Sequence, residues 1–219
     1  MSGRLRKMTD ENKKIKNRYN RVSKIYDGLE KPVEALFMGK WREELIEKIE
    51  AQELLEVGVG TGKNLTYYPK DLNITGIDFS QKMLNKARKR AKNSQHIELK
   101  EMDAQEMTFE ENSFDTVLTS FVFCSVPDPV KGLKEIRRVC KNEGKVVMLE
   151  HVRSDQKVLG KFMDLVNFIP VNIWGANINR NTVDNLVKAG FKRKDIKVQK
   201  LLGDIVKLIE IRNHKSESF

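Results

Sequence analysis

Short apolar runs alternate with longer helical patterns from residue 53 to the end of the chain. The short runs predict strands over residues 53–57, 73–78, 95–101, 114–121 and 145–151. The helical patterns predict helices over residues 80–92, 129–141 and 181–189. Strands that alternate with helices in this way form a parallel sheet with helices on both faces. We therefore expect an α/β fold.

The last part of the chain carries two further apolar runs, over residues 191–199 and 203–212. They are joined by only a few residues that include Gly203, and such a short join makes an antiparallel pair. We expect this pair at the edge of the sheet. Residues 152–180 form one long insertion before the last predicted helix.

The N-terminal region has the pattern of a helix with one apolar stripe. Apolar residues recur there at spacings of three and four, namely Ile15, Tyr19, Val22, Tyr26 and Leu29. A second helical stretch covers residues 32–50 and starts with a proline, which suits the first turn of a helix. Residues 1–24 hold nine Lys or Arg against two acidic residues, which gives +7 of the net charge of +10. We expect residues 1–50 to form a basic amphipathic arm or lid and residues 51–219 to form one domain.

Composition narrows the classes of protein. A chain of 219 residues with 39% hydrophobic and 33% charged residues has room for one core and is not wholly disordered. Its positive net charge favours anionic partners such as lipid head groups or nucleic acid. Cys124 and Cys140 are the two cysteines and do not form a CxxC pair, so neither a disulfide framework nor a metal site is expected.

Membrane-spanning segments are not expected either. The longest uncharged stretch, residues 165–179, is interrupted by Pro170 and Gly175 and is too short to span ~30 Å of hydrocarbon. The first residues also lack the apolar core of a secretory signal. We therefore expect a cytoplasmic protein whose membrane contact is at most peripheral, at the inner face of the membrane.

The strongest chemical signal is a buried strand that runs into a glycine-rich turn at residues 54–62. Glycines allow a sharp turn and let a ligand approach the backbone closely. The spacing is G-x-G-x-G, and Lys63 stands where a dinucleotide fingerprint has its third glycine, so NAD binding is not expected. Asp78, at the end of the second predicted strand, can accept both hydroxyls of a ribose. Together these residues indicate a nucleoside ligand.

These motifs resemble those of the class I S-adenosylmethionine-dependent methyltransferases, and the resemblance covers residues 18–212 approximately. It implies a Rossmann-like, seven-stranded, mostly parallel sheet with an antiparallel C-terminal edge strand, helices on both faces and an N-terminal helical arm. It also implies S-adenosyl-L-methionine as cofactor and S-adenosyl-L-homocysteine as product.

The resemblance assigns cofactor-binding roles residue by residue. The loop of Gly58, Gly60 and Gly62 would approach the methionine part, and Asp78 would hold the ribose. The remaining roles fall on Glu56 at the methionine ammonium, Asp103 and Ala104 at the adenine, Phe79 and Met83 beside the adenine or ribose, and Ser120 and Phe121 facing cofactor and substrate. Each residue also has a purely structural interpretation, such as a tight turn or a helix cap, but their occurrence in order favours binding.

Several segments look like the branch of quinone-biosynthesis and phospholipid N-methyltransferases, which also includes membrane-associated thiol methyltransferases. They are Tyr26-Asp27, the Gly58 to Gly62 loop, Thr75 to Ser80, Val126 to Pro129 and Glu150 to Val152. This branch implies a small lipophilic acceptor, with the head-group amine of a phosphatidylethanolamine-like lipid as the first hypothesis. Methylation of a quinone precursor at carbon or oxygen, or of a small thiol at sulfur, is the alternative. Cys124 and Ser125 depart from the branch, because many relatives have two histidines there.

The sequence contains fewer signals for the residues that would bind the methyl acceptor. The run from Trp174 to Arg180 is similar to an acceptor-side loop of such enzymes, which makes Asn177 and Arg180 candidates for substrate binding. Methyl transfer is an in-line displacement and needs a base only when the acceptor starts protonated. Tyr19, Tyr26 and His151 are the candidate bases, each with a packing role as the alternative.

Two other classes of function are weaker. A nucleic-acid methyltransferase would use the positive charge. However, Ser120 to Phe123 is not the Asn/Asp-Pro-Pro-aromatic segment typical of base methylation, so nucleic acid is not expected as a partner. A binding module that has the fold but no activity is the other class. The intact set of predicted cofactor residues argues against it. The basic arm either lies on an anionic membrane surface or covers the cofactor, and one helix could do both. The sequence carries no signal for the oligomeric state.

Overall fold

The computed structural model describes residues 38–92, 94–168 and 177–215. The helices of this part are α4 (Gly39–Ile46), α5 (Gln81–Arg90), α6 (Pro129–Val139), α7 (Lys157–Val166) and α9 (Thr182–Lys188), with short 3-10 turns η2 (Asn64–Thr66) and η3 (Arg193–Asp195). The strands are β1 (Glu53–Val57), β2 (Asn73–Asp78), β3 (Ile97–Glu101), β4 (Phe114–Ser120), β5 (Cys140–His151), β6 (Ile196–Leu202) and β7 (Val206–Arg212).

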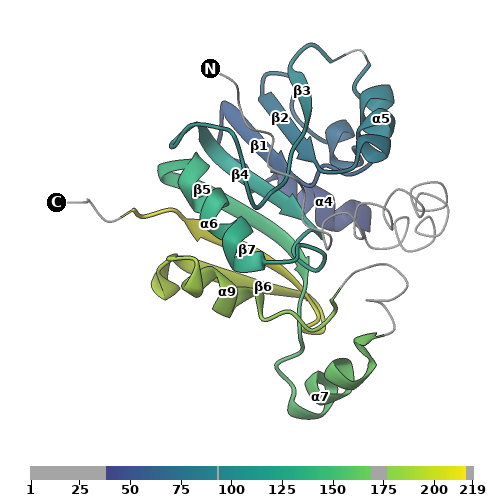
Figure 1. The fold of residues 1–219 in the computed structure, drawn as a ribbon, viewed down its shortest axis with the longest axis vertical. Helices are drawn as coiled ribbons and strands as arrows, with labels where there is room; N and C mark the ends of the chain where they lie inside the picture. The colour runs from purple at the N-terminus through teal and green to yellow at the C-terminus, as the bar shows by residue number, and fades with distance from the viewer. Residues whose placement is uncertain (1–37, 93, 169–176, 216–219) are drawn as a thin grey trace.

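The strands form one seven-stranded sheet in the order β3-β2-β1-β4-β5-β7-β6 (Figure 1). Strands β1 to β5 pair in parallel, whereas β7 is antiparallel to both β5 and β6. The predicted α/β fold is confirmed, and the antiparallel pair lies at the edge as expected. Within that pair, β6 is the edge strand and β7 lies between β6 and β5. The strand that runs antiparallel to its neighbours, β7, is therefore second from the edge.

Helices cover both faces of the sheet. Neighbouring residues of β1 point to opposite faces, as the period of a strand requires: Leu54 packs in one apolar cluster and Leu55 in the other. Buried residues of α6 and α9 belong to the cluster of Leu55, and those of α4 and α5 belong to the cluster of Leu54. The sheet is therefore enclosed between two helical layers.

Helix α4 falls within the predicted arm but packs on the sheet. Its Trp41 and Leu45 are buried in the same cluster as Leu54. The predicted helix over residues 32–50 ends at Ile46 in the structure, and its first residues, together with Tyr19 and Tyr26, lie outside the described residues.

Several strand boundaries differ from the prediction, most clearly the starts of β5, β6 and β7. The predicted strand over residues 191–199 begins only at Ile196, because the Asp195 N–H donates to the Lys192 carbonyl (2.9 Å) and closes a 3-10 turn. The next strand begins at Val206 instead of residue 203, since Gly203 adopts φ +57° in the hairpin turn. Strand β5 starts at Cys140, earlier than predicted, because Phe114 of β4 pairs with Cys140. An apolar pattern does not reveal such turns and pairings.

Helix α7 was not predicted within the insertion. It lies apart from the sheet, below β6 and β7 in Figure 1. Ser154 precedes it and accepts a hydrogen bond from the Gln156 N–H (3.1 Å). No helix within the described ranges combines the length and apolar character needed to cross a membrane.

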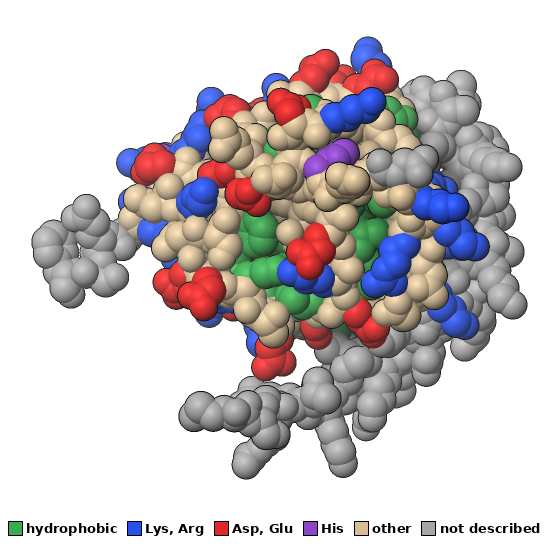
Figure 2. Space-filling view, turned by 90° about the horizontal axis from the view of Figure 1, so that it is seen from above, with side chains coloured by type: hydrophobic (Ala, Val, Ile, Leu, Met, Phe, Trp, Pro, Cys, Tyr) green, Lys and Arg blue, Asp and Glu red, His purple; other side chains and the backbone are tan. Residues whose placement is uncertain are grey.

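Both kinds of charged side chain, Lys and Arg as well as Asp and Glu, lie on the face of the sheet domain seen in Figure 2. This distribution agrees with the sequence, in which residues 1–24 account for most of the net charge of +10. Electrostatic attraction to an anionic surface would therefore come mainly from the arm.

Candidate active site

The predicted cofactor residues gather at one edge of the sheet. Parallel pairing of β1 with β2 and β4, and of β4 with β5, brings the carboxyl ends of these strands together. Open α/β sheets bind ligands outside the carboxyl ends of their strands. The glycine loop follows β1, Asp78 ends β2, Asp103 follows β3, and Phe121 follows β4. Residues far apart in the sequence thus share one place.

The glycine loop is held tightly against the strands. The N–H groups of Gly58 and Val59 both donate to the Ile77 carbonyl, at 2.8 and 2.9 Å. Gly58 has φ +73°, and a Cβ atom there would lie 2.4 Å from Val122 Cγ2. At Gly60, with φ +56°, an added Cβ would meet no atom closer than 3.9 Å. The loop is therefore closed toward β4 and open at Gly60, where a ligand can approach the backbone.

Asp78 connects the glycine loop to β2. One carboxylate oxygen accepts from the Gly60 N–H (3.0 Å) and the other from the Ser80 N–H (2.8 Å). The side chain is buried. Ser80 caps α5 by accepting from the Met83 N–H, so Asp78 also fixes the start of that helix. Phe79 is half-buried beside Asp78, whereas Met83 is 2% exposed and packs in the interior.

Glu56 lies under the glycine loop in a buried polar network. Its two oxygens accept from the Asn64 amide (2.7 Å) and the Tyr68 hydroxyl (2.9 Å), and Arg42 of α4 donates to Asn64. Burial raises the pKa of Glu56 to about 7 from an ordinary 4.5, and it raises the pKa of Tyr68 as well. The network links β1 to α4.

The raised pKa of Glu56 predicts a pH dependence of stability. The folded state binds more protons than the unfolded state between pH 4.5 and 7, so the contribution of Glu56 to the free energy of unfolding decreases as the pH rises through this window. We expect the free energy of unfolding of the wild type, taken relative to that of Glu56→Gln, to fall by about 1 to 3 kcal/mol from pH 4.5 to pH 7. Urea unfolding of both proteins measures it, and parallel pH curves would contradict the raised pKa.

Gln105 holds Asp103 in the loop after β3. The backbone N–H and the side-chain amide of Gln105 donate to Asp103 Oδ1 at 2.9 and 3.0 Å. The side-chain amide oxygen (Oε1) of Gln105 accepts from the N–H of Asp128 (3.0 Å), the residue that caps α6. Asp103 is therefore fixed to the start of α6, and Ala104 is half-buried beside it.

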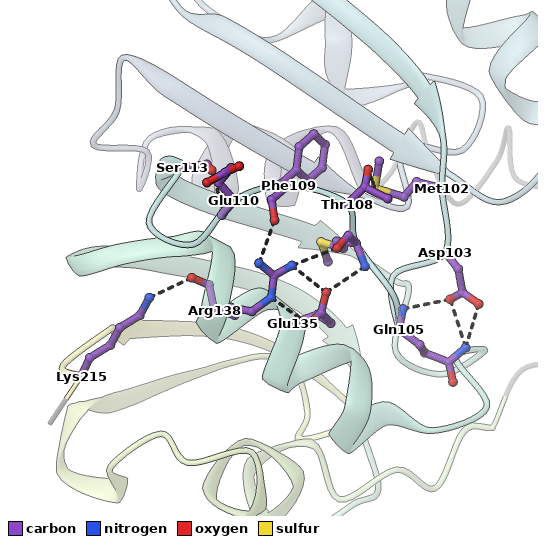
Figure 3. A network of polar contacts seen from close by, with 11 residues as sticks. Met102, Asp103, Gln105, Thr108, Phe109, Glu110, Ser113, Glu135, Arg138 and Lys215 are labelled. Carbon is purple, nitrogen blue, oxygen red and sulfur yellow. Dashed lines mark hydrogen bonds and ion pairs between the residues drawn. The ribbon is translucent and has the colours of Figure 1, made fainter. Parts of the chain in front are cut away.

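Arg138 of α6 holds the far end of the same loop (Figure 3). It donates to the carbonyls of Phe109 (2.7 Å) and Met107 (2.9 Å) and to Glu135 (2.9 Å). Glu135 also accepts from the Met107 N–H (2.8 Å), and the hydrogen bond from Arg138 lowers the pKa of this carboxyl. Both ends of the loop that carries Asp103 are thus fixed to one helix.

The turn after β4 is held by a buried carboxyl of β5. Glu150 accepts from the Thr119 hydroxyl (3.0 Å), the Val122 N–H (3.2 Å) and the Phe123 N–H (3.2 Å). It is 0% exposed, and burial raises its pKa to about 7. Between these contacts Phe121 adopts φ +56°, a conformation that costs energy for a non-glycine residue. Glu150 is therefore the residue that holds the strained turn.

Two predicted site residues, Ser120 and Phe121, lie where β4 passes into this turn. The Phe121 ring lies against the His151 ring with centroids 4.6 Å apart, and His151 itself is exposed at the end of β5. The Ser120 hydroxyl oxygen is buried and has no hydrogen-bond partner among the described residues. A buried hydroxyl without a partner is costly unless a ligand supplies one.

Asn177 and Arg180 tie the insertion to the segment after β4. The Asn177 N–H and side-chain amide donate to the Cys124 carbonyl (2.7 and 3.2 Å), and Arg180 donates to the Val126 carbonyl (2.9 Å). Both residues thus contact backbone carbonyls of the segment after β4, and their role in substrate binding stays a prediction. Cys124 is buried, and burial raises its pKa to about 12, so its thiol stays protonated at neutral pH.

Sequence reasoning did not identify Glu150 or Gln105 as site residues. For Glu150 a signal existed, because a carboxyl at the end of an apolar strand is rarely buried without a partner. No local signal marked Gln105, which depends on the packing of α6. The described residues contain no cluster of His, Cys, Asp or Glu suited to a metal ion.

A polar depression of about 430 Å³ lies at the opposite ends of the strands, lined by residues that include Glu50, Asp115, Lys141 and Arg212. Its charges pair with one another, as in Lys141 with Asp115 and Arg212 with Glu50. This depression is therefore a surface of paired charges, and it is separate from the edge of the sheet that holds the glycine loop.

Comparisons with known proteins agree with this geometry. A family model described as a methyltransferase domain matches residues 55–148. The ubiquinone/menaquinone biosynthesis C-methyltransferase UbiE of Citrifermentans bemidjiense is 31% identical over 171 residues, which cover 74% of this chain and 72% of that enzyme. The phosphatidylethanolamine N-methyltransferase of Cereibacter sphaeroides is 42% identical over 106 residues, 47% of this chain and about half, 52%, of that enzyme.

Solved structures show the same fold. A Thermotoga maritima S-adenosylmethionine-dependent methyltransferase, described as a possible histamine N-methyltransferase, superposes with a TM-score of 0.71 at 20% identity over 90% of this chain and 99% of that one. A Haemonchus contortus phosphoethanolamine N-methyltransferase, solved with phosphomonomethylethanolamine and S-adenosylhomocysteine, gives a TM-score of 0.59 at 25% identity over 74% of this chain and 39% of that one.

Fold, glycine loop and sequence relatives together define the class of protein. The chain belongs to the class I S-adenosylmethionine-dependent methyltransferases. Its cofactor is S-adenosyl-L-methionine.

Proposed function

We propose that this methyltransferase transfers methyl groups to the head-group amine of phosphatidylethanolamine or a similar phospholipid. The observation that carries the proposal is the 42% identity over 106 residues to the Cereibacter sphaeroides phosphatidylethanolamine N-methyltransferase. Identity to the UbiE quinone methyltransferase is lower, at 31%, although it extends over more of the chain. Both relatives act on lipophilic molecules by name, which supports a lipophilic acceptor.

The residues at the carboxyl edge of the sheet fit S-adenosyl-L-methionine. Gly60 leaves the backbone open to a ligand, and the buried Ser120 hydroxyl has no partner in the part of the chain that the structure describes. In this proposal Asp78 accepts from the ribose hydroxyls, and Asp103 accepts from the adenine amino group. Glu56 lies under the loop on the side of the methionine ammonium, and Phe79, Ala104 and Phe121 shape the surrounding walls, with Met83 packed behind them in the interior. When bound, the cofactor supplies an electrophilic methyl group on sulfur.

The chain must also remove a proton from the acceptor. A phospholipid amine is an ammonium at neutral pH and attacks only after losing a proton. His151 is the described candidate base, because it is exposed at the end of β5 beside Phe121. Tyr19 and Tyr26 remain candidates from the arm, outside the described residues. Asn177 and Arg180 hold the acceptor side against the segment after β4.

A direct assay tests the acceptor. With labelled S-adenosyl-L-methionine and mixed vesicles of phosphatidylethanolamine and phosphatidylglycerol, we expect label in mono- and dimethylated phosphatidylethanolamine. Vesicles in which phosphatidylcholine replaces phosphatidylethanolamine are the control and should take up no label. Label that appears only in demethylmenaquinone or in a small thiol would replace the proposal with one of those alternatives, and label only in RNA would reject a lipophilic acceptor.

The basic arm is proposed to attract the protein to anionic membranes. Each Lys or Arg near such a surface contributes about 1 kcal/mol, and salt screens the attraction. We expect vesicle cosedimentation at low salt to fall strongly when Lys13, Lys14, Lys16, Arg18 and Arg21 are changed to Gln. Unchanged binding of this variant, or binding that salt does not weaken, would leave the arm as a lid only.

A further inference from the structure

Helix α7 carries an apolar face that no part of the described domain covers. Val158, Phe162 and Leu165 are 85%, 58% and 72% exposed. Their positions differ by four and three residues, so they lie along one side of the helix. Single exposed apolar residues are ordinary on a protein surface, but a continuous stripe of large ones indicates a binding face. Within the described residues, neither apolar cluster of the sheet includes a residue of α7.

The opposite side of α7 is fastened to the domain. Gly160 and Met163 are buried, and a Cβ at Gly160 would lie 2.7 Å from an Arg153 side-chain nitrogen and the Ser154 carbonyl. Arg153 donates to both oxygens of Asp164 on the helix, at 3.0 and 2.8 Å. The helix is therefore held in one orientation, and its apolar stripe stays turned away from the domain.

Charges around the stripe are positive. Lys157 and Lys161 are exposed on α7 itself, next to the apolar side chains. The two acidic residues at the helix are already paired: Asp164 with Arg153 (2.8 Å), and Asp155 with Lys207 (3.0 Å). A helix with Phe and Leu on one side and Lys beside them has the composition of helices that lie in the plane of a membrane interface.

The position of α7 connects this face to the acceptor. The helix follows β5, whose carboxyl end carries His151, and the chain after it returns through Asn177 to the Cys124 carbonyl. Asn167, just beyond α7, accepts from the Ile178 N–H (2.9 Å). A surface on which α7 rests would thus adjoin the edge of the sheet where the acceptor is methylated.

We propose that α7 inserts Val158, Phe162 and Leu165 into the interface of an anionic lipid bilayer, as an apolar anchor separate from the basic arm. The choice of a lipid surface as occupant rests on the proposed function, because a lipid acceptor requires the enzyme to reach a bilayer. Insertion of apolar side chains resists salt, whereas attraction of the arm does not. The two contacts can therefore be separated by experiment.

Insertion is measured by fluorescence of the full chain. Phe162→Trp and the control Val187→Trp, at an exposed position of α9, are mixed with vesicles of phosphatidylglycerol and phosphatidylcholine without phosphatidylethanolamine or cofactor. We expect a blue shift and quenching by brominated acyl chains for Phe162→Trp, above the signal of the native tryptophans that the Val187→Trp protein also contains. In parallel, Phe162→Ser with Leu165→Ser should lower salt-resistant vesicle binding at least about tenfold, whereas Val187→Ser should not.

Several outcomes would overturn the proposal. One is a Phe162→Trp protein that binds vesicles without any blue shift or quenching. Another is a self-association in solution that the two serine changes abolish, which would make a second copy of the chain the occupant of the face. Unaltered cofactor affinity of the serine variant shows that the fold is intact. Lost insertion with continued methylation of phosphatidylethanolamine rejects only this anchor, and insertion without such methylation rejects only the proposed acceptor.

Discussion

Replacing Asp78 with alanine is expected to weaken S-adenosyl-L-methionine binding at least about tenfold, since charge-assisted hydrogen bonds to a buried carboxylate contribute ~1.5 to 3 kcal/mol. The structure adds a second reason. Asp78 also accepts from the N–H groups of Gly60 and Ser80, so its removal frees the glycine loop and the start of α5. Isothermal titration calorimetry measures the affinity.

Two further variants make this result specific. Asp71→Ala changes an exposed aspartate in the turn before β2 and should leave the affinity unchanged. Asp78→Asn keeps one acceptor oxygen and should fall between wild type and the alanine variant. A folded Asp78→Ala protein that binds the cofactor with unchanged affinity would show that the ribose is held elsewhere.

The second large effect is expected at Glu150. Glu150→Ala leaves the Thr119 hydroxyl and the N–H groups of Val122 and Phe123 without their acceptor in a buried place. We expect the free energy of unfolding to fall by about 2 to 4 kcal/mol. Because Val122 also packs against Gly58, the cofactor affinity should fall by about tenfold.

The glutamine variant separates the hydrogen bonds of Glu150 from its charge. Glu150→Gln resembles the protonated acid, which predominates below the raised pKa of about 7. At pH 6 its stability should lie within about 1 kcal/mol of wild type, and its cofactor affinity should be nearly unchanged. Urea unfolding and calorimetry test both quantities. If the glutamine and alanine variants were equally impaired, the acceptor role of Glu150 in holding the turn after β4 would be wrong.

Local patterns in the sequence were sufficient for most of the elements and for the class of protein. The strands over residues 53–57 and 73–78 coincide with β1 and β2, because a short apolar run between turn residues has one stable form in a covered parallel sheet. Gly58 and Gly60 adopt the positive φ angles that glycine allows, so the tight turn predicted to bind the ligand could be located from the glycines themselves. Such signals are contained within a few residues.

Other features depended on which distant segments meet, and only the tertiary structure decided them. In the sequence, Glu150 is only a charged residue within an apolar strand. The pairing of Ser120 with Leu149 places the turn after β4 next to its side chain, which then accepts the hydrogen bonds of that turn. Gln105 gains its role from the cap of α6, and the stripe of α7 has the pattern of a buried helix although the domain leaves it exposed. Short-range periodicity and turn chemistry were enough to predict the fold class and the cofactor, and they indicated the loop after β1 as the place where the cofactor would bind. Long-range packing decided how the edge of the sheet that carries this loop is held and which apolar face remains exposed, because neither is encoded at a fixed spacing along the chain.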